Sequence, residues 1–253
     1  MKKIGSYELI RQIGEGGFAR TYEGRHLLNS EIKACLKQNI NLSEEDKALL
    51  AREAYLISKV DHYSLPSFRD LYEIDDSLVL AMSFVEGKSL DKIIEKHKAL
   101  HPEEVSWITQ RVLNALHYLH HEGIIHGDIK PPNLIVQPPK HNALLVDFGL
   151  SSLKPTSKTM AQGYTTVFAA PEVVDGKPPL PQSDFYSLGL TMIYAWGGDL
   201  LTKTNPDYVP KPLQDLVAEF LHPDPLQRPD WSTDLIKRLS DIRFEVFGRR
   251  HSG

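Results

Sequence analysis

The chain has 253 residues, 41% hydrophobic and 25% charged, which is typical of a soluble globular protein with one large domain or two small lobes. Its net charge of −4 argues against a nucleic-acid-binding protein, because such proteins usually carry a basic excess. No stretch approaches the ~20 apolar residues of a membrane-spanning helix. A single cysteine, Cys35, excludes an internal disulfide and is typical of a reducing, cytoplasmic compartment.

The first part of the chain is predicted to be rich in β-strands. Residues 7–25 contain two alternating runs around a glycine-rich turn, which is a hairpin pattern. Residues 31–40 predict a third strand, and residues 68–85 predict two more strands on either side of Asp75-Asp76. These strands precede a region whose pattern predicts helices.

Residues 43–60 predict a helix, with Ser43 as its N-cap and acidic residues in its first turn. Glu53 shares the apolar face of this helix with Leu49, Leu56 and Val60. A carboxylate that faces the interior needs a partner, because an unpaired buried charge is very costly. Lys37, at the end of the third strand, is the expected partner, and the pair would hold this lysine toward the phosphates of a nucleotide.

The rest of the chain is predicted to be helical. Residues 103–123 place one apolar stripe on a helix that stops at Gly123, and the stripe consists of Val105, Ile108, Val112, Leu116 and Leu119. Further helices are expected at Ser183–Trp196, Leu213–Leu221 and Ser232–Arg243, and the short basic cluster Arg249-Arg250 is interpreted as a solvated end.

A β-rich lobe followed by a larger helical lobe is α+β in class. The border is expected near Glu86-Gly87, and a cleft at such a border is a natural ligand site.

Two glycines in the first hairpin, Gly14 and Gly16, are candidates for phosphate binding. Glycine lets a backbone close over phosphates and offer its N–H groups to them. An ordinary glycine hairpin explains these residues equally well.

The stretch GIIHGDIKPPNLIV, residues 123–136, carries polar groups suited to phosphoryl transfer. Asp128 can accept a proton from a substrate hydroxyl, and Lys130 can stabilise the charge of the transferred group. Asn133 can offer an amide oxygen to Mg²⁺. Asp147 follows an apolar strand, a common position for a ligand of a hard metal ion.

Taken in order, these residues resemble the motifs of the eukaryotic-type (Hanks-type) serine/threonine protein kinases, and the resemblance covers nearly the whole chain. GEGGFA resembles the glycine-rich loop, ACLK the strand lysine motif, HGDIKPPN the catalytic loop, and DFG is intact at Asp147–Gly149. AAPE, ending at Glu172, resembles the close of the activation segment. Asp184 matches the aspartate that braces the catalytic loop, and Arg228 matches the arginine that pairs with this glutamate.

The resemblance implies a single bilobal α+β kinase domain over residues 1–253, with a β-rich lobe of residues 1–85 that holds one regulatory helix and a helical lobe of residues 86–253. It implies transfer of the γ-phosphoryl group of ATP, with Mg²⁺ or substituting Mn²⁺, to serine or threonine hydroxyls of proteins, including the protein itself. Neither a nucleic-acid partner nor a membrane span is implied. The short GGFARTY segment and the compact size are similar to bacterial, and in particular cyanobacterial, members.

By resemblance, the catalytic residues are Asp128, Lys130, Lys37 and Glu53, the metal is held by Asn133 and Asp147, and Thr165 and Glu172 belong to the substrate and activation segment. The implied nucleotide-binding residues include Met82 as gatekeeper and Ser89 near the ribose, and the full set is Ile13, Gly14, Glu15, Gly16, Gly17, Thr21, Cys35, Lys37, Met82, Phe84, Val85 and Ser89. For Cys35, two explanations remain open: it is a small residue that fills space in the interior, or its thiol lines the ATP pocket.

The chain departs from the family at His126-Gly127-Asp128, where an arginine usually precedes the aspartate. In the family this arginine commonly pairs with a phosphate on the activation loop, and glycine has no side-chain donor. We therefore expect activity without phosphorylation of Thr156, Ser157 or Thr159. A glycine chosen to suit a local turn is the alternative explanation.

Three further expectations concern function. His-Gly-Asp also occurs in small-molecule kinases of the aminoglycoside and choline type, but Lys130, the Glu172 and Arg228 motifs and the continuous glycine-rich loop oppose that alternative. A nucleotide-binding pseudokinase is opposed by the intact lysine and aspartates. The short stretch between Trp196 and Leu213 predicts that a partner-docking helix of the family is reduced or absent.

Overall fold

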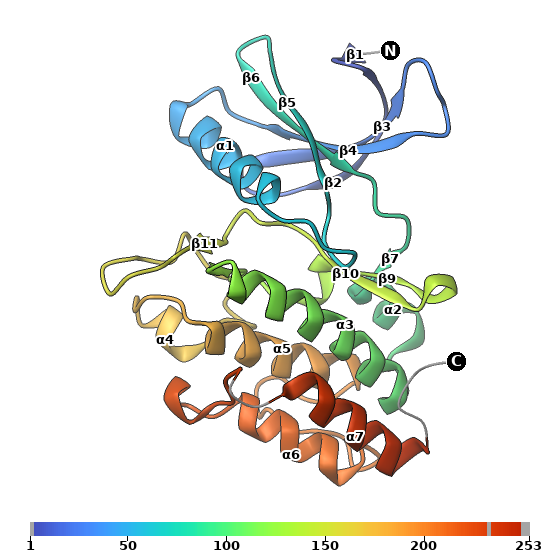
Figure 1. Cartoon of the computed structure of the whole chain (residues 1–253), viewed down its shortest axis with the longest axis vertical. Coiled ribbons are helices and arrows are strands. Elements are labelled where there is room, and N and C mark those ends of the chain that lie inside the picture. Colours follow the sequence, from blue (N-terminus) through green and yellow to red (C-terminus); the bar gives the residue numbers. More distant parts are fainter. Residues whose placement is uncertain (1–2, 232–233, 249–253) are drawn as a thin grey trace. The chain divides into compact units, whose positions relative to one another are not determined.

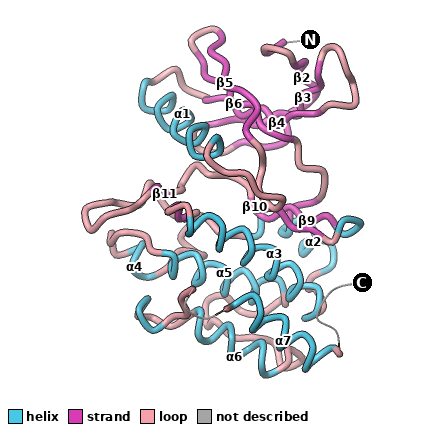
Figure 2. The backbone as a smooth tube through the Cα atoms, in the orientation of Figure 1, coloured by secondary structure: helices cyan, strands magenta, loops and turns pink. Residues whose placement is uncertain are grey.

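The computed structural model describes residues 3–231 and 234–248, and the chain divides into two compact units, 1–86 and 87–253. The first unit is mainly β and the second mainly helical, which confirms the predicted α+β class (Figures 1 and 2). Arg249-Arg250 and the expected helix start at Ser232 lie outside the described residues.

The first unit is a six-stranded antiparallel sheet with strand order β1-β2-β3-β4-β6-β5. The predicted hairpin, third strand and final strand pair are all present. The bounds are β1 (Lys3–Ile4), β2 (Tyr7–Glu15), β3 (Ala19–His26), β4 (Lys33–Asn39), β5 (Phe68–Ile74) and β6 (Ser77–Ser83). Lys37 was expected at the end of its strand, but β4 continues to Asn39 because its pairing with β3 extends to that residue.

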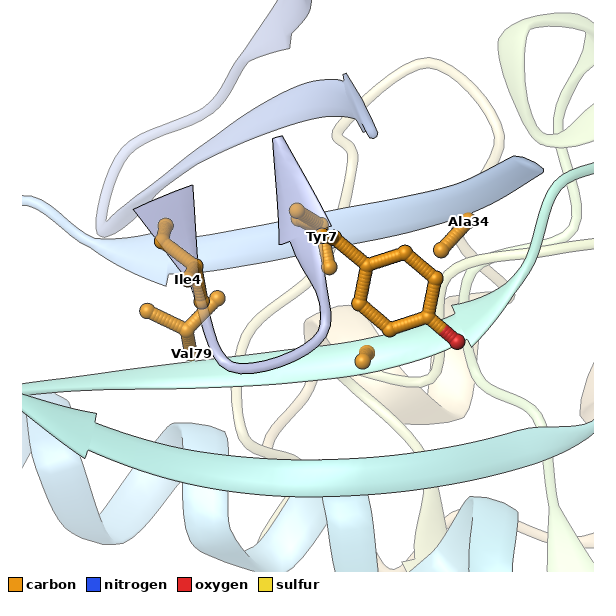
Figure 3. Close-up of a cluster of buried hydrophobic side chains, with 6 residues drawn as sticks. Ile4, Tyr7, Ala34 and Val79 are labelled. Atoms are coloured by element: carbon orange, nitrogen blue, oxygen red, sulfur yellow. The ribbon is translucent and has the colours of Figure 1, made fainter. Parts of the chain in front are cut away.

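Side chains of successive strand residues point to opposite faces of this sheet. One face carries an apolar cluster made of Ile4, Tyr7, Ala34, Leu36, Val79 and Ala81, shown in Figure 3. Helix α1 (Glu44–Ser58) packs on β4, β5 and β6. Because Lys37 follows Leu36, it points to the face opposite the cluster, where its side chain meets this helix.

Helix α1 begins as its sequence predicts. The hydroxyl of Ser43 accepts a hydrogen bond of 3.2 Å from the N–H of Asp46, and three acidic residues occupy the first turn. The inward face differs in detail from the expected stripe, because Leu49 is only half-buried and Val60 lies beyond the end of the helix.

The second unit is built around helix α5 (Pro181–Ala195), in which 12 of 15 residues are buried. A helix that is apolar all round must be covered on all sides, so α5 lies at the centre of its unit. The other helices are α2 (Leu90–His97), α3 (Pro102–His121), α4 (Pro171–Val174), α6 (Lys211–Phe220) and α7 (Leu235–Phe247). The last of these was expected to end at Arg243 but continues to Phe247, where Gly248 caps it in a left-handed conformation.

The second unit also contains short strands, which pair in two small sheets. Strands β7 (Lys88–Ser89), β9 (Leu134–Gln137) and β10 (Asn142–Leu145) form a sheet of order β10-β9-β7, and β8 (Ile124–Ile125) pairs with β11 (Ser152–Leu153). Among the described residues, 3₁₀ turns lie at Pro131–Asn133, Pro138–Lys140 and Pro225–Gln227. Residues 197–210, all of them described, contain no helix, as expected from the shortness of this stretch.

In the described parts of the chain, no helix combines the length and apolar character needed to cross a membrane.

A glycine substitution in the turn between β5 and β6 is expected to stabilise the protein. Asp75 and Asp76 both have positive φ, of 50° and 61°, the conformation of a type I′ hairpin turn that favours glycine at its second central position. Asp76→Gly should raise the free energy of unfolding by about 0.5 kcal/mol, because it relieves a left-handed backbone. Ser30→Gly, at an exposed turn position without positive φ, should lower it by a similar amount. Equal losses in the two variants, measured by denaturant unfolding, would contradict this account.

Candidate active site

In the first unit, Lys37 and Glu53 form a buried ion pair. The Nζ of Lys37 lies 2.9 and 2.7 Å from the two carboxylate oxygens of Glu53, and the residues are only 7% and 2% exposed. The helical spacing that placed Glu53 on an inward face therefore led to the correct partner. The pair fixes an ammonium group on the sheet face that carries α1.

The glycine-rich turn between β2 and β3 is closed by a hydrogen bond of 2.9 Å from the N–H of Gly16 to the carbonyl of Ala19. A Cβ added at Gly14 or Gly16 would meet its nearest neighbour at 3.8 Å, and at Gly17 it would meet nothing within 4 Å. None of these glycines has a positive φ. Neither backbone conformation nor internal packing therefore accounts for glycine at these positions.

The remaining predicted nucleotide residues lie in or beside the strands. Met82 on β6 is buried and is the cross-strand neighbour of Cys35 on β4. The Nζ of Lys33 lies 5.5 Å from the centre of the Phe84 ring and 3.0 Å from Glu86, just after β6. The others are Ile13 and Glu15 on β2, Thr21 on β3, Val85 after β6, and Ser89 at the start of α2 in the second unit.

In the second unit, three other predicted residues meet at Asp128. Its Oδ1 accepts a hydrogen bond of 2.8 Å from the hydroxyl of Thr165, and its Oδ2 lies 2.8 Å from Nζ of Lys130 and 2.9 Å from Nδ2 of Asn133. Lys130 also donates to the Thr165 hydroxyl at 2.8 Å. Asp128 is 7% exposed, so this carboxylate is held in one orientation from three sides.

The main chain before Asp128 is anchored from α5. The carboxylate of Asp184 is almost fully buried and accepts hydrogen bonds from the N–H groups of His126, at 2.9 Å, and Gly127, at 2.8 Å. His120 of α3 contacts the same carboxylate. Burial lowers the pKa of His126, so its ring is neutral, and its Nδ1 accepts from the N–H of Asp128 at 3.3 Å.

Gly127 has a φ of +78°, and a Cβ added there would lie 2.9 Å from the carbonyl oxygen of Leu150. A side chain at this position would therefore adopt a strained backbone and push against the main chain. This favours the explanation in which Gly127 suits its local turn, and it is compatible with the loss of an arginine contact.

Asp147 lies two residues after β10 and has a φ of +71°, which is unusual for a non-glycine residue and often marks a functional site. Its Oδ1 accepts from the N–H of Gly149 at 3.2 Å, while Phe148 is buried with its ring 5.2 Å from that of His126.

Asn133 directs both amide hydrogens to Asp128, one to the carbonyl and one to the carboxylate, each at 2.9 Å. The side-chain oxygen of Asn133 is then the part suited to a cation. Within residues 3–231 and 234–248 no cluster of three or more His, Cys, Asp or Glu side chains is placed for metal binding. Two oxygen ligands from Asn133 and Asp147 fit Mg²⁺, which usually takes one or two protein ligands together with substrate phosphates.

The segment from Asp147 to Glu172, which corresponds to the activation segment expected from the sequence, is held at both ends. At its start, β11 pairs with β8, and the hydroxyl of Ser151 donates to the carbonyl of His126 at 2.9 Å. At its end, Arg228 donates to both carboxylate oxygens of Glu172, at 2.7 and 2.8 Å, and Ser183 donates to the same carboxylate at 2.6 Å.

Sequence reasoning missed several residues that contact these groups, namely Ser151, Ser183 and His120. Each acts through a contact with a residue distant in sequence, so no local spacing marks it. The only available signal was the placement of Ser183 directly before Asp184 on a buried helix.

Known proteins are similar to this chain over most of its length. The profile of the protein kinase domain family matches residues 7–238. Similar curated proteins include hormonally up-regulated neu tumor-associated kinase homolog A of Xenopus laevis, 30% identical over 94% of this chain and 38% of the relative. Serine/threonine-protein kinase PrkC of Bacillus subtilis is 26% identical over 96% of this chain and 42% of its own. Serine/threonine-protein kinase F of Synechocystis is 28% identical over 88% of this chain and 52% of its own length. The chain thus spans about half or less of the length of these relatives.

The Glu172–Arg228 pair predicts a pH-dependent loss of stability. Burial alone would raise the pKa of Glu172, but the hydrogen bonds from Arg228 and Ser183 outweigh it and hold this pKa below its ordinary value of 4.5. Glu172→Gln should lower the free energy of unfolding by about 3 kcal/mol, because Arg228 keeps its buried charge without a counter-charge.

A depressed pKa contributes stability that is complete above pH 4.5 and is lost as the pH falls through the folded-state value. The deficit of Glu172→Gln should therefore shrink in acid. Glu219→Gln is the matched control, because Glu219 also makes a two-pronged pair with an arginine but its side chain is 42% exposed. Its loss should stay below about 1 kcal/mol. Equal losses for both variants in urea titrations between pH 3.5 and 7 would refute the assignment.

Proposed function

Because this chain belongs to the protein kinase domain family, we propose that it transfers the γ-phosphoryl group of ATP to serine and threonine hydroxyls of proteins. The observation that carries the proposal is the oriented carboxylate of Asp128 with Lys130, Asn133 and Thr165 around it. The bacterial relatives named serine/threonine-protein kinases support both the acceptor class and a bacterial source.

The contacts of Thr165 support a role for Asp128 toward an alcohol. An aliphatic hydroxyl, that of Thr165, already donates to Oδ1 at 2.8 Å. A carboxylate offers about four lone-pair positions. The partners seen among the described residues take one position on Oδ1 and two on Oδ2, which leaves room on Oδ1 for a substrate hydroxyl.

In the proposed step, the substrate oxygen forms a bond to the γ-phosphorus while the bond from that phosphorus to the β–γ bridging oxygen breaks, so ADP leaves. Asp128 orients the hydroxyl and takes its proton. Lys130 lies 2.8 Å from Asp128 and so places a positive charge beside the transferring group. Such positioning and charge stabilisation supply most of the catalysis in phosphoryl transfer.

In the first unit, the proposed nucleotide contacts are made by Lys37 and by the glycine-rich turn. Lys37, held by Glu53, would bind the α and β phosphates, and the N–H groups around Gly14 and Gly16 would bind phosphate oxygens. Support comes from glycines that neither φ nor packing requires, because close approach of a ligand is a remaining reason for them. Mg²⁺, or Mn²⁺ in its place, would be held by Asn133 and Asp147 and would neutralise charge on the phosphates.

We further propose that the activation segment needs no phosphate to be ordered. Gly127 offers no side-chain donor to a phosphate, while main-chain pairing of β8 with β11 and the Ser151 and Glu172 bonds hold the segment at its two ends. Thr156 and Thr159 bond to each other in a local turn, with Oγ1 atoms 3.3 Å apart.

Transfer of labelled phosphate from Mg²⁺-ATP tests the proposed activity. The wild type should label serine or threonine of a generic basic protein or of itself, and Asp128→Asn should lower the rate at least about 100-fold, because it removes the proton acceptor. Asp175→Asn, at an exposed position with 62% of its side chain accessible, is the control and should not alter the rate. Label found only on small hydroxyl compounds would replace the proposal with small-molecule phosphorylation, and absence of any transfer would refute it.

Replacement of Thr156, Ser157 and Thr159 together by alanine should leave kcat within about twofold of the wild type. Ser151→Ala should lower it, because the fully buried hydroxyl fixes the catalytic loop through the carbonyl of His126. A triple variant that folds, as judged by its melting temperature, but has lost activity would show that phosphorylation is required.

A further inference from the structure

Trp231 is linked to the catalytic loop through two buried side chains. Its indole Nε1 donates a hydrogen bond of 2.9 Å to Nδ1 of His120, a residue 111 positions earlier in the chain. Nε2 of the same ring lies 2.8 Å from Oδ2 of Asp184, and the side chains of His120 and Asp184 are each 1% exposed. The proposed chemistry assigns no role to Trp231 or His120.

These contacts determine which nitrogen of His120 carries the proton. An indole N–H can only donate, so Nδ1 of His120 must accept and cannot bear a hydrogen. The carboxylate of Asp184 can only accept, so Nε2 must carry the hydrogen. Trp231 thus selects the neutral tautomer in which His120 donates to Asp184.

Asp184 in turn holds the main chain before Asp128. The hydrogen from His120 goes to Oδ2, which also accepts from the N–H of His126 at 2.9 Å, while Oδ1 accepts from that of Gly127 at 2.8 Å. A carboxylate with three donors in fixed directions cannot rotate without losing one of them. The direction of the Asp184 carboxylate therefore depends on the His120 tautomer.

The packing around Trp231 is consistent with a fixed ring. Its centroid lies 5.0 Å from that of Phe185, edge to face, and 4.8 Å from that of His117. Arg228, three residues earlier, holds Glu172 of the activation segment. One short segment, residues 228–231, thus reaches both the activation segment and the catalytic loop.

We propose that Trp231 is a positioning residue, which acts through the His120 tautomer and Asp184 to fix the main chain that presents Asp128. The effect of Trp231 on the turnover rate rests on the proposed kinase function. Its effect on the order of the main chain before Asp128 does not. Removal of the indole N–H should leave substrate binding unchanged and reduce the fraction of time in which Asp128 is aligned.

The test is Trp231→Phe in the full chain, with Trp107→Phe as the matched control. Trp107 is a mostly buried tryptophan of α3 whose ring meets that of His141, so the control loses the same atoms in the same unit. We expect Trp231→Phe to lower kcat about tenfold, a barrier change of about 1.4 kcal/mol, with KM for ATP and for the acceptor within twofold. Trp107→Phe should match it in thermal stability but keep the wild-type kcat.

Two readouts do not require activity. Nitrogen-15 shifts of the His120 ring should report the Nε2-protonated tautomer in the wild type and a mixture in Trp231→Phe. Hydrogen exchange at the His126 and Gly127 amides should be at least tenfold faster in Trp231→Phe than in Trp107→Phe. Unchanged shifts and exchange, or equal kcat in the two variants, would overturn the proposal. A wild type that transfers no phosphate would overturn the proposed function, while ring shifts and exchange would still decide the role of Trp231.

Discussion

The buried carboxylate of Asp184 is the interaction on which the rest of the second unit depends. A charge 1% exposed at the centre of a domain is tolerable only when hydrogen bonds replace the water it has lost. Here those bonds come from one side chain and from two consecutive main-chain N–H groups, of His126 and Gly127. The need to solvate one charge therefore fixes the conformation of the loop that ends in Asp128.

The same principle applies at Glu172, where the segment that begins at Asp147 ends. Glu172 is solvated by Arg228 and Ser183, so a segment with many exposed residues is attached to the helical core by a buried pair. In the first unit, Lys37 and Glu53 solvate each other in a similar way. Each buried charge in these three places is matched by donors or acceptors from a different element, so charge pairing, in addition to apolar packing, specifies how the elements meet.

The sequence predicted the regular elements well, because periodicity marks α1, α3 and the strands. Its ordered motifs also singled out Asp128 and Asn133, which the structure brings together. It did not predict α2, in which only Leu90 and Ile94 are buried, or the short strands β9 and β10 as a pair. His120 and Trp231 were also missed, because their bond joins distant parts of the chain and leaves no local pattern. That Gly127 suits a local turn was one of two explanations open from the sequence, and only the backbone geometry, with its positive φ, could favour it.

The long sequence separation of the Glu172–Arg228 bond has a consequence for synthesis. The two residues are 56 positions apart in the chain. A ribosome releases the chain from its N-terminus onward, and domains generally fold in that order. The segment that ends at Glu172 emerges before Arg228, so this bond cannot form until synthesis has advanced a further 56 positions. Asp128 and Asp147 are therefore synthesised before the bond that holds the end of this segment can form.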